Sequence, residues 1–259
     1  ADAFLAGESE FGINLAYNLA AQQGENDVPY TGIVALNEHA SILHYMIYDT
    51  AIPDEHRSFL IDAGASCHGY ASDITRTYAK QAGAFADLIT EVDALTLALI
   101  DELKPGVPYP VLQTKAHEGI GRILQQAGIV NMSAEDCVAE GITKTFFPHG
   151  IGHFLGLQVH DVGGLVSDDR GTPCPAPDDH PFLRCTRTVE AQQVFTVEPG
   201  LYFIESLLAD LKASEQSKFI NWDTVAAFKP FGGIRIEDNV IVHRDRNENM
   251  TREAGLNKA

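Results

Sequence analysis

The sequence has no apolar run long enough to cross a lipid bilayer, because no stretch approaches the roughly 20 uninterrupted apolar residues that a spanning helix requires. Its first residues, ADAFLAGESEF, lack the basic-then-apolar pattern of a signal peptide. The four cysteines form no CxxC pair and no dense disulfide framework. These absences predict a cytoplasmic protein with reduced thiols and no membrane partner.

Basic residues are also scarce. There are 18 of them against 36 acidic residues, and the formal net charge is −18. Such a chain repels polyanions and has no basic stripe for a phosphate backbone, so nucleic acid is excluded as a partner. The acidic surface by itself indicates no substrate. With 259 residues and 45% hydrophobic content, the chain can form one large domain or two small ones, and one compact domain is the expectation.

Apolar periodicity divides the chain into regions rich in helices and regions rich in strands. Phe11, Leu15 and Leu19 recur at the spacing of an amphipathic helix. Helices are predicted at 8–21, 84–103, 111–127 and about 134–144, the last with Ser133 as its N-cap. Strands are predicted from short apolar runs at 30–48, 58–66, 72–79, 193–197 and 233–242. This order predicts an α+β fold in which helices cover a curved antiparallel sheet.

Two aspartates interrupt the strands at 58–66 and 72–79. A hairpin centred between Cys67 and His68 would place Asp62 directly opposite Asp73, on the same face of the sheet. Two buried carboxylates repel each other, and a shared proton or an intervening cation would relieve the repulsion. Alternatively, each aspartate alone is a turn or hydrogen-bonding residue. The pair therefore indicates a metal site only together with further ligands.

Further ligand types occur later in the chain, again in apolar surroundings. Glu198 ends the run VFTVE, and Glu237 lies in GGIRIEDNVIV, where alternation places Arg235 on the same face. His153 in HGIGH adds a nitrogen donor. Four carboxylates and one imidazole suit hard or borderline cations such as Mn²⁺, Co²⁺ or Zn²⁺. Two divalent ions would balance the charge of the four carboxylates, whereas one would leave an excess of negative charge.

Three more histidines, His44, His149 and His160, could flank this centre as proton carriers or hydrogen-bond donors. Taken singly, each is an ordinary structural or surface histidine. His149 and His153 have helical metal-pair spacing, but Gly150 and Gly152 lie between them and argue against a regular helix.

The ordered set of Asp62, Asp73, PHGIGH, VHD, TVEPG and GIRIEDNV resembles the pita-bread metallopeptidase superfamily, over nearly the whole chain. Within that superfamily, the segments LGLQVHDVGG, LRCTR, FIESLL and KPFGGIRIEDNV resemble bacterial prolidases, the group that also contains organophosphorus acid anhydrolase. The resemblance implies a hydrolase with two divalent ions, most often Mn²⁺, that cleaves Xaa-Pro dipeptides.

The resemblance also implies roles for individual residues. The five metal ligands would be Asp62, Asp73, His153, Glu198 and Glu237. Asp73 and Glu237 would bridge both ions, Asp62 would hold one, and His153 with Glu198 would hold the other. Catalytic roles fall to Glu198 as a proton shuttle and to His160 and His149 beside the substrate. Substrate-binding positions would be His44, Arg184, Arg235 and Tyr30, with Arg184 pairing with the substrate carboxylate.

Prolidases carry an N-terminal domain before the catalytic one. Residues 1–259 are therefore expected to form the catalytic metallopeptidase domain without it, and the full-length protein is expected to be a homodimer that acts on a small peptide. A side activity on organophosphorus esters follows from the same resemblance. The alternatives are aminopeptidase P, methionine aminopeptidase, or a non-catalytic binding module with the same fold.

Overall fold

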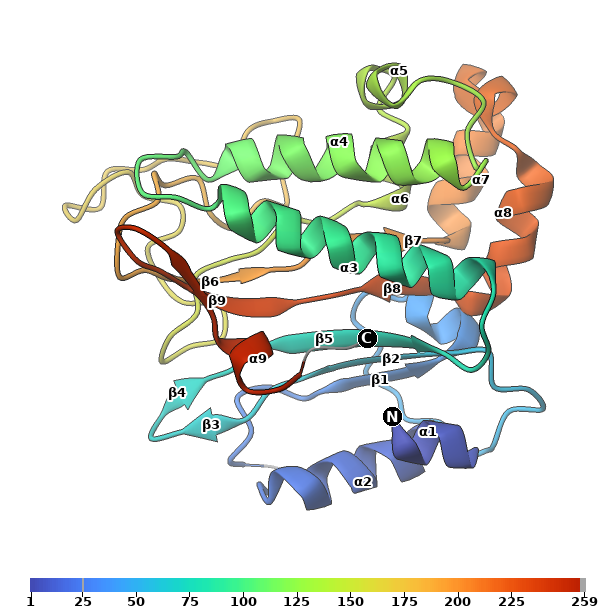
Figure 1. Cartoon of the computed structure of the whole chain (residues 1–259), viewed down its shortest axis with the longest axis horizontal. Helices are drawn as coiled ribbons and strands as arrows, with labels where there is room; N and C mark the ends of the chain where they lie inside the picture. Colours follow the sequence, from blue (N-terminus) through green and yellow to red (C-terminus); the bar gives the residue numbers. More distant parts are fainter. Residues whose placement is uncertain (25, 257–259) are drawn as a thin grey trace.

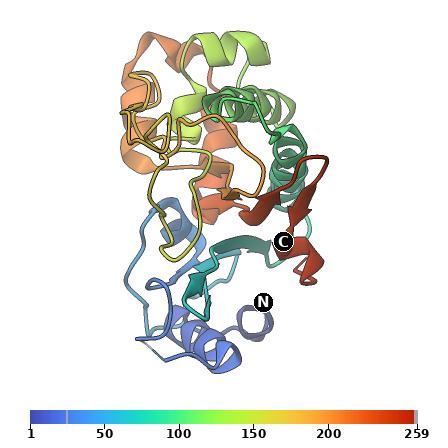
Figure 2. The same cartoon turned by 90° about the vertical axis from the view of Figure 1, so that its left-hand side faces the viewer.

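The computed structural model describes residues 1–24 and 26–256. Its helices lie on two sides of a curved antiparallel sheet (Figures 1 and 2). Among the described residues, no helix is long and apolar enough to cross a membrane. The α-helices and strands, in chain order, are α1 (Asp2–Ala6), α2 (Glu10–Ala21), β1 (Ile33–Leu36), β2 (Ser58–Ala63), β3 (Ser66–Cys67), β4 (Tyr70–Ala71), β5 (Ile74–Ala79), α3 (Ala84–Glu102), α4 (Pro110–Gln126), α5 (Ala134–Ala139), α6 (Thr143–Phe146), β6 (Val194–Val197), β7 (Gly200–Tyr202), α7 (Glu205–Ala213), α8 (Trp222–Phe228), β8 (Gly233–Arg235), β9 (Asp238–Val242), β10 (Asn247–Asn249) and α9 (Met250–Glu253).

The sheet is built from two halves that meet beside the candidate site. One half has the strand order β1-β2-β5, and the other contains β10-β9-β6 and the pair β7-β8. An isolated antiparallel bridge between Thr75 and Glu237 joins them. The hydroxyl of Thr77 strengthens the junction, because it donates to the Arg235 carbonyl and accepts from the Arg235 N–H, both at 3.0 Å. Residues more than 150 positions apart are thereby brought side by side.

The two faces of the sheet are buried by different layers. Helices α3 and α4 cover one face, over a large apolar core that includes Ile234 and Ile236. On the other side, α1 and α2 pack against β1, where Val34 contributes to one small cluster and Ile33 to a second. Alternate residues of a strand point to opposite faces. All four residues of β1 are buried, so both faces of this strand are covered.

The predicted helices at 84–103 and 111–127 are confirmed as α3 and α4. The helix predicted at 134–144 is wrong in its length. Ser133 caps α5 as expected, accepting from Asp136 N–H at 3.1 Å, but α5 ends at Ala139. Gly141 then takes a φ of 72°, a left-handed conformation that ends a helix, and α6 begins separately at Thr143.

The helix predicted at 8–21 is confirmed as α2, which begins after its N-cap Ser9. However, the apolar stripe of this helix does not face the core. Phe11, Leu15 and Leu19 are 43%, 52% and 81% exposed, whereas Ile13 is buried. The amphipathic pattern therefore predicted the helix correctly but not the face that is buried here.

The predicted register of the hairpin at 58–79 is also wrong. Asp62 pairs with Thr75, not with Asp73. The turn lies at His68 and Gly69, which both have positive φ (52° and 82°), and this two-residue turn shifts the pairing by two positions. Because the shift is even, Asp62 and Asp73 still share one face of the sheet.

Candidate metal centre

The first part of the site lies on β2 and the chain entering β5. The phenol of Tyr30 lies 2.7 Å from Asp62 Oδ1 and 2.6 Å from Asp73 Oδ1, so it joins the two carboxylates. On its other oxygen, Asp62 accepts from Arg235 Nη2 at 2.6 Å. Asp73 is buried. The hairpin thus brings the two predicted aspartates together, and Tyr30, which precedes β1, contacts both.

The second part comes from the chain between β8 and β9. Glu237 is 2% exposed, and its Oε2 accepts from the Thr75 hydroxyl at 2.8 Å. Arg235 Nε donates to the same hydroxyl at 3.2 Å, so both side chains lie on the face predicted for them. In the described part of the chain, Glu237 Oε1 is buried without a hydrogen-bond partner. An unpartnered buried carboxylate oxygen is unfavourable unless a cation occupies the space beside it.

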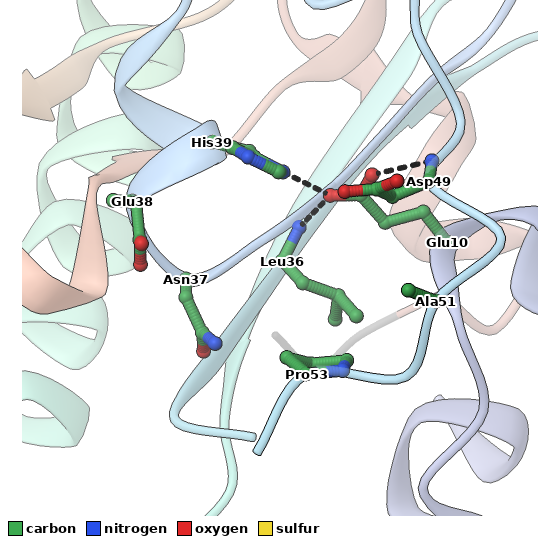
Figure 3. Close-up of a pocket in the computed structure, with 8 residues that line it drawn as sticks. All are labelled: Glu10, Leu36, Asn37, Glu38, His39, Asp49, Ala51 and Pro53. Atoms are coloured by element: carbon green, nitrogen blue, oxygen red, sulfur yellow. Dashed lines mark hydrogen bonds and ion pairs between the residues drawn. The ribbon is translucent and has the colours of Figure 1, made fainter. Parts of the chain in front are cut away.

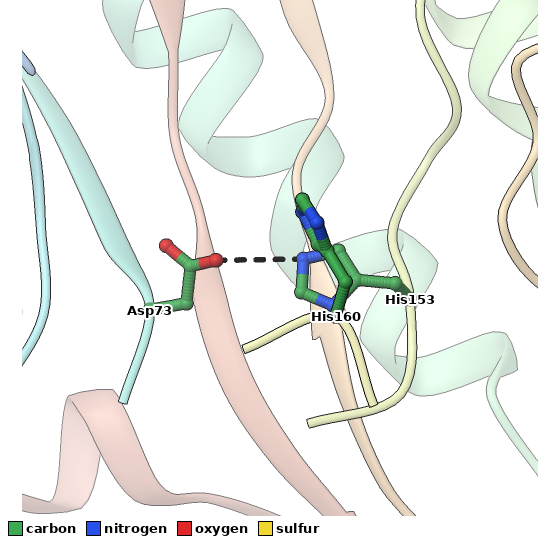
Figure 4. Close-up of side chains that lie close together, drawn as sticks. All are labelled: Asp73, His153 and His160. Carbon is green, nitrogen blue, oxygen red and sulfur yellow. Dashed lines mark ion pairs between the residues drawn. The ribbon is translucent and has the colours of Figure 1, made fainter. Parts of the chain in front are cut away.

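His153 and Glu198 complete the cluster. His153 Nδ1 lies 2.8 Å from the carbonyl oxygen of Phe154, so Nδ1 carries the proton and donates. The other ring nitrogen, Nε2, lies 3.4 Å from Asp73 Oδ2 and 3.8 Å from Glu198 Oε1 (Figure 4 shows the Asp73 contact). A carbonyl that holds one ring nitrogen while the other faces carboxylates is the usual support of a metal-binding histidine.

The donor atoms form three overlapping groups, each with its ligand atoms within 4.8 Å of one another. One contains Asp62, Asp73 and Glu237, and a second contains His153, Glu198 and Glu237. The third contains Asp73, His153 and His160. Glu237 belongs to the first two groups. Asp73 belongs to the first and the third, and so links Asp62 to His153.

Burial and mutual repulsion disturb the ionisation of this cluster. Burial raises the pKa of Glu198 to about 7, and burial with repulsion from Asp73 raises the pKa of Asp62. The pKa of Glu237 is raised well above its ordinary value by burial and by the neighbouring carboxylates. Burial opposes charge on His153, but Asp73 and Glu198 outweigh it and raise the pKa of the imidazole. The protein alone therefore leaves these negative charges undercompensated.

The residues fit a pair of divalent cations. Carboxylate oxygens with one imidazole are the ligands that Mn²⁺, Co²⁺ and Zn²⁺ accept, and bound cations would remove the repulsion described above. Glu237, whose Oε1 has no hydrogen-bond partner among the described residues, belongs both to the group with Asp62 and Asp73 and to the group with His153 and Glu198.

His149 lies beside the cluster with both ring nitrogens engaged. Nδ1 lies 2.8 Å from the Gly150 carbonyl and therefore donates, so Nε2 accepts from the Tyr202 hydroxyl at 2.8 Å. Tyr202 in turn accepts from Arg235 Nη1 at 3.0 Å. Burial and the nearby positive charge of Arg235 lower the pKa of His149 to about 3, so this imidazole is neutral near pH 7.

The cluster opens into a cleft of about 1580 Å³. His44, Arg184 and His160 line it, and all three are exposed. The ring of His160 meets the ring of His153 edge-on, with centroids 4.3 Å apart (Figure 4). Burial and the positive charges of His153 and Arg184 lower the pKa of His160 to about 4. All predicted site residues therefore either belong to the cluster, contact it or line this cleft.

Thr75, Tyr202 and Asn239 were not predicted, although they organise the site. Thr75 had a usable signal, because the polar residues Asp73, Thr75 and Thr77 alternate along one strand. Asn239 follows Glu237 by two residues in the same way. Tyr202 carried no such signal, since its partners come from distant parts of the chain.

Helices over a curved antiparallel sheet, with carboxylates and an imidazole gathered at its centre, define a metallopeptidase of the pita-bread type. The chain belongs to metallopeptidase family M24, whose model matches residues 3–244.

Proteins similar in sequence carry a common name. The chain is 64% identical to an "Xaa-Pro dipeptidase" of Pseudoalteromonas atlantica and 57% identical to one of Shewanella denitrificans. These alignments cover 99% and 98% of the chain but only 59% and 58% of the two relatives. The chain thus spans less than two thirds of the length of these proteins.

Solved structures confirm the predicted fold. An aminopeptidase PepP of Pseudomonas aeruginosa has a TM-score of 0.77 and 27% identity, covering 100% of this chain and 52% of that one. Zinc-substituted aminopeptidase P of Escherichia coli, in complex with product, has a TM-score of 0.71 and 28% identity, covering 95% and 50%.

Proposed function

We propose that the protein is a dinuclear-metal hydrolase that cleaves Xaa-Pro dipeptides. The observation that carries the proposal is the sharing of Glu237 between two donor groups, one with Asp62 and Asp73 and the other with His153 and Glu198. A shared carboxylate at the centre of two groups suits two cations close together. Mn²⁺ is the proposed ion, and Co²⁺ or Zn²⁺ would suit the same ligands.

In this proposal Asp62 would hold one ion, His153 and Glu198 would hold the other, and Asp73 and Glu237 would contribute to both. Two divalent ions would supply Lewis acidity, which makes water nucleophilic near neutral pH and polarises the scissile carbonyl. The unpartnered Oε1 of Glu237 and the close approach of Asp73 to His153 support this division.

The proton transfers are assigned to residues at the edge of the cluster. Glu198 is proposed to accept a proton from the attacking water on its carboxylate and to pass it to the leaving proline nitrogen, as a general base and then a general acid. His160 is neutral near pH 7, since its pKa is about 4, and could donate a hydrogen bond to the developing oxyanion. His149 is proposed to support the same region, since both its ring nitrogens have partners.

Substrate binding is assigned to the cleft. Arg184 is proposed to pair with the substrate carboxylate, with His44 near the same end, because both are exposed side chains that line the cleft. Tyr30 and Arg235 are proposed to form the wall beside Asp62, which both contact. An arginine that binds a carboxylate favours a substrate ending one residue after the scissile bond, and hence a dipeptide.

The names of the relatives at 64% and 57% identity support the dipeptidase proposal. The alternative is aminopeptidase P, the name of solved structures at 27–28% identity, which would cleave longer peptides. Methionine aminopeptidase is a weaker alternative, because none of the similar proteins described above has that name. A non-catalytic module is also weaker, because all five ligand positions are filled.

The test is hydrolysis of Ala-Pro, Ala-Pro-Ala and Met-Ala-Ser by Mn²⁺-loaded protein, with Asp73→Asn as a control. Cleavage of Ala-Pro alone, abolished by the substitution, is the expected result. Cleavage of Ala-Pro-Ala would instead assign aminopeptidase P, and cleavage of Met-Ala-Ser would assign methionine aminopeptidase. Failure to bind Mn²⁺ and to cleave any of the three would indicate the non-catalytic module.

Further parts of the proposal concern the whole protein. Residues 1–259 are proposed to be the catalytic domain of a cytoplasmic homodimer, and organophosphorus esters are proposed as side substrates. Hydrolysis of diisopropyl fluorophosphate by the Mn²⁺-loaded protein, and sedimentation of the full-length protein, test the last two points.

A further inference from the structure

Away from the carboxylate cluster, Glu10 at the start of α2 collects four hydrogen bonds on one buried carboxylate. Its Oε1 accepts from Leu36 N–H and from His39 Nδ1, both at 2.8 Å. Its Oε2 accepts from the Tyr45 hydroxyl at 2.8 Å and from Asp49 N–H at 2.9 Å. Glu10 is 1% exposed. Figure 3 shows its carboxylate between the backbone of Leu36 and that of Asp49.

All four donors belong to one segment, residues 36–49, which we call the cleft loop. The loop starts at the end of β1, continues through the 3₁₀ helix η1 (Asn37–Ser41) and contains no helix or strand after it. The two backbone donors, Leu36 and Asp49, are its first and last residues. Glu10 therefore closes the loop at its base.

The cleft loop also forms part of the wall of the large cleft. Residues 38, 39 and 41–44 line that cleft together with Asp62 and Glu237 of the carboxylate cluster. Glu10 does not line the large cleft and makes no hydrogen bond to the cluster. The cleft loop is therefore the direct connection between Glu10 and the cleft.

We propose that Glu10 is a positioning residue for substrate binding, because it holds the cleft loop, and with it His39 and His44, against the cleft. The test of this proposal uses Ala-Pro as substrate and therefore rests on the proposed function. The ring of Tyr45 stacks on the ring of His39 with centroids 4.6 Å apart, so two of the four donors also support each other.

A carboxylate is required at this position. Both oxygens of Glu10 accept two hydrogen bonds each, and a glutamine offers only one oxygen and would turn an N–H₂ group toward two of the donors. The same contacts argue against a metal site in this small pocket of about 110 Å³, although His39 and Asp49 lie near enough to be ligands. Donors already occupy both carboxylate oxygens.

The experiment compares three variants of Mn²⁺-loaded protein with the wild type, using Ala-Pro as substrate and amide hydrogen exchange as a second readout. For Glu10→Gln, we expect KM to rise about tenfold with kcat within about twofold, since the loop and not the cluster is disturbed. Exchange should increase in residues 36–49 and stay unchanged in residues 58–79. Tyr45→Phe removes one of four donors and should raise KM less. Glu8→Gln, an exposed neighbour, should change neither readout.

Unchanged KM and unchanged exchange in residues 36–49 for Glu10→Gln would overturn the proposal. So would a loss of kcat accompanied by weaker Mn²⁺ binding, because Glu10 would then act on the carboxylate cluster. If Glu10→Gln does not fold, Tyr45→Phe decides by the same two readouts. If the wild type does not cleave Ala-Pro, the proposed function fails, and the hydrogen exchange still decides whether Glu10 holds the loop.

Discussion

The side chain of Asn239 binds both backbone polar groups of Asp73. Its Oδ1 accepts from Asp73 N–H at 3.1 Å, and its Nδ2 donates to the Asp73 carbonyl at 2.6 Å. Asn239 is 3% exposed and lies two residues after Glu237. Strand β9, which begins directly after Glu237, therefore fixes the backbone of Asp73, which lies 166 residues from Asn239 in sequence.

Replacing Asn239 with alanine should weaken both the fold and metal binding. The N–H and C=O of Asp73 would lose their partners, and an unsatisfied buried group costs about 1–3 kcal/mol. We expect a loss of about 2 kcal/mol in the free energy of unfolding, measured in urea. We expect Mn²⁺ affinity, measured by calorimetry, to fall about tenfold, as when a support of a metal ligand is removed.

A matched control is Asn221→Ala. Asn221 caps α8 by accepting from Thr224 N–H at 3.3 Å, and losing such a cap costs about 1 kcal/mol. It contacts no residue of the carboxylate cluster, so Mn²⁺ affinity should not change. Equal losses of affinity in both variants would mean that Asn239 acts through general stability.

Gly64 leads to a second prediction, because it lies opposite Asp73 in the hairpin, beside the pair Ala63 and Ile74. A Cβ at Gly64 would lie 1.9 Å from the Ser72 carbonyl oxygen and 2.8 Å from a ring carbon of Tyr30. Gly64→Ala should therefore push the hairpin strands apart and lower the free energy of unfolding by about 3 kcal/mol.

Thermal unfolding and Mn²⁺ titration of Gly64→Ala test this, with Gly24→Ala as the control. Among the described residues, a Cβ at Gly24 would come within 4 Å only of the flexible carboxylate of Asp27, at 3.1 Å, so that variant should unfold like the wild type. Wild-type stability in Gly64→Ala would contradict the predicted clash.

The sequence predicted the composition of the site better than its geometry. The carboxylates stand out because charged residues in apolar strands need compensation, and that requirement can be recognised without coordinates. The pairing of Asp62 could not be recognised in the same way, since it depends on the turn at His68 and Gly69. The dipeptide His68-Gly69 was the available signal, because glycine readily adopts the positive φ of such a turn.

Other features depend on contacts between distant segments. Nothing near Glu10 in sequence indicates that its partners lie at residues 36–49, and Asn239 lies still further from its partner Asp73. The helix face of Leu15 and Leu19 is a further example. Periodicity identifies an apolar face of a helix but not which surface covers that face, and here these side chains are exposed.

Glu237→Gln should separate metal binding from stability. Burial and the neighbouring carboxylates raise the pKa of Glu237 well above its ordinary value, so the charged carboxylate is unfavourable in the metal-free protein, and the neutral glutamine has the same shape. The melting temperature without metal should change little. Wild-type protein should gain about 2.7 kcal/mol when free Mn²⁺ is 100 times its Kd, and the variant should lose this gain.

Differential scanning calorimetry with Mn²⁺ or with a chelator measures both quantities. Glu190→Gln, an exposed site far from the cluster, should keep the full gain from Mn²⁺. An unchanged gain in Glu237→Gln would show that Glu237 is not a ligand.

His117 should make the protein sensitive to acid. It is 3% exposed, with Nδ1 3.0 Å from the Thr143 hydroxyl and Nε2 3.1 Å from Gln113 Nε2, which donates to it. Burial, with the positive charges of His180 and Lys144, lowers its pKa to about 4. The unfolded chain binds a proton near pH 6.5 and the folded protein only near pH 4, so this stabilisation is complete above 6.5 and is lost as the pH falls to 4.

His117→Gln should therefore reduce the pH dependence of the free energy of unfolding between pH 6.5 and 4, by at most about 1.4 kcal/mol per pH unit. Urea unfolding of metal-free protein at several pH values measures this slope. His149 and His160 also have lowered pKa values, so part of the slope should remain. A wild-type slope in His117→Gln would mean that His117 is protonated in the folded protein at the same pH as in the unfolded chain.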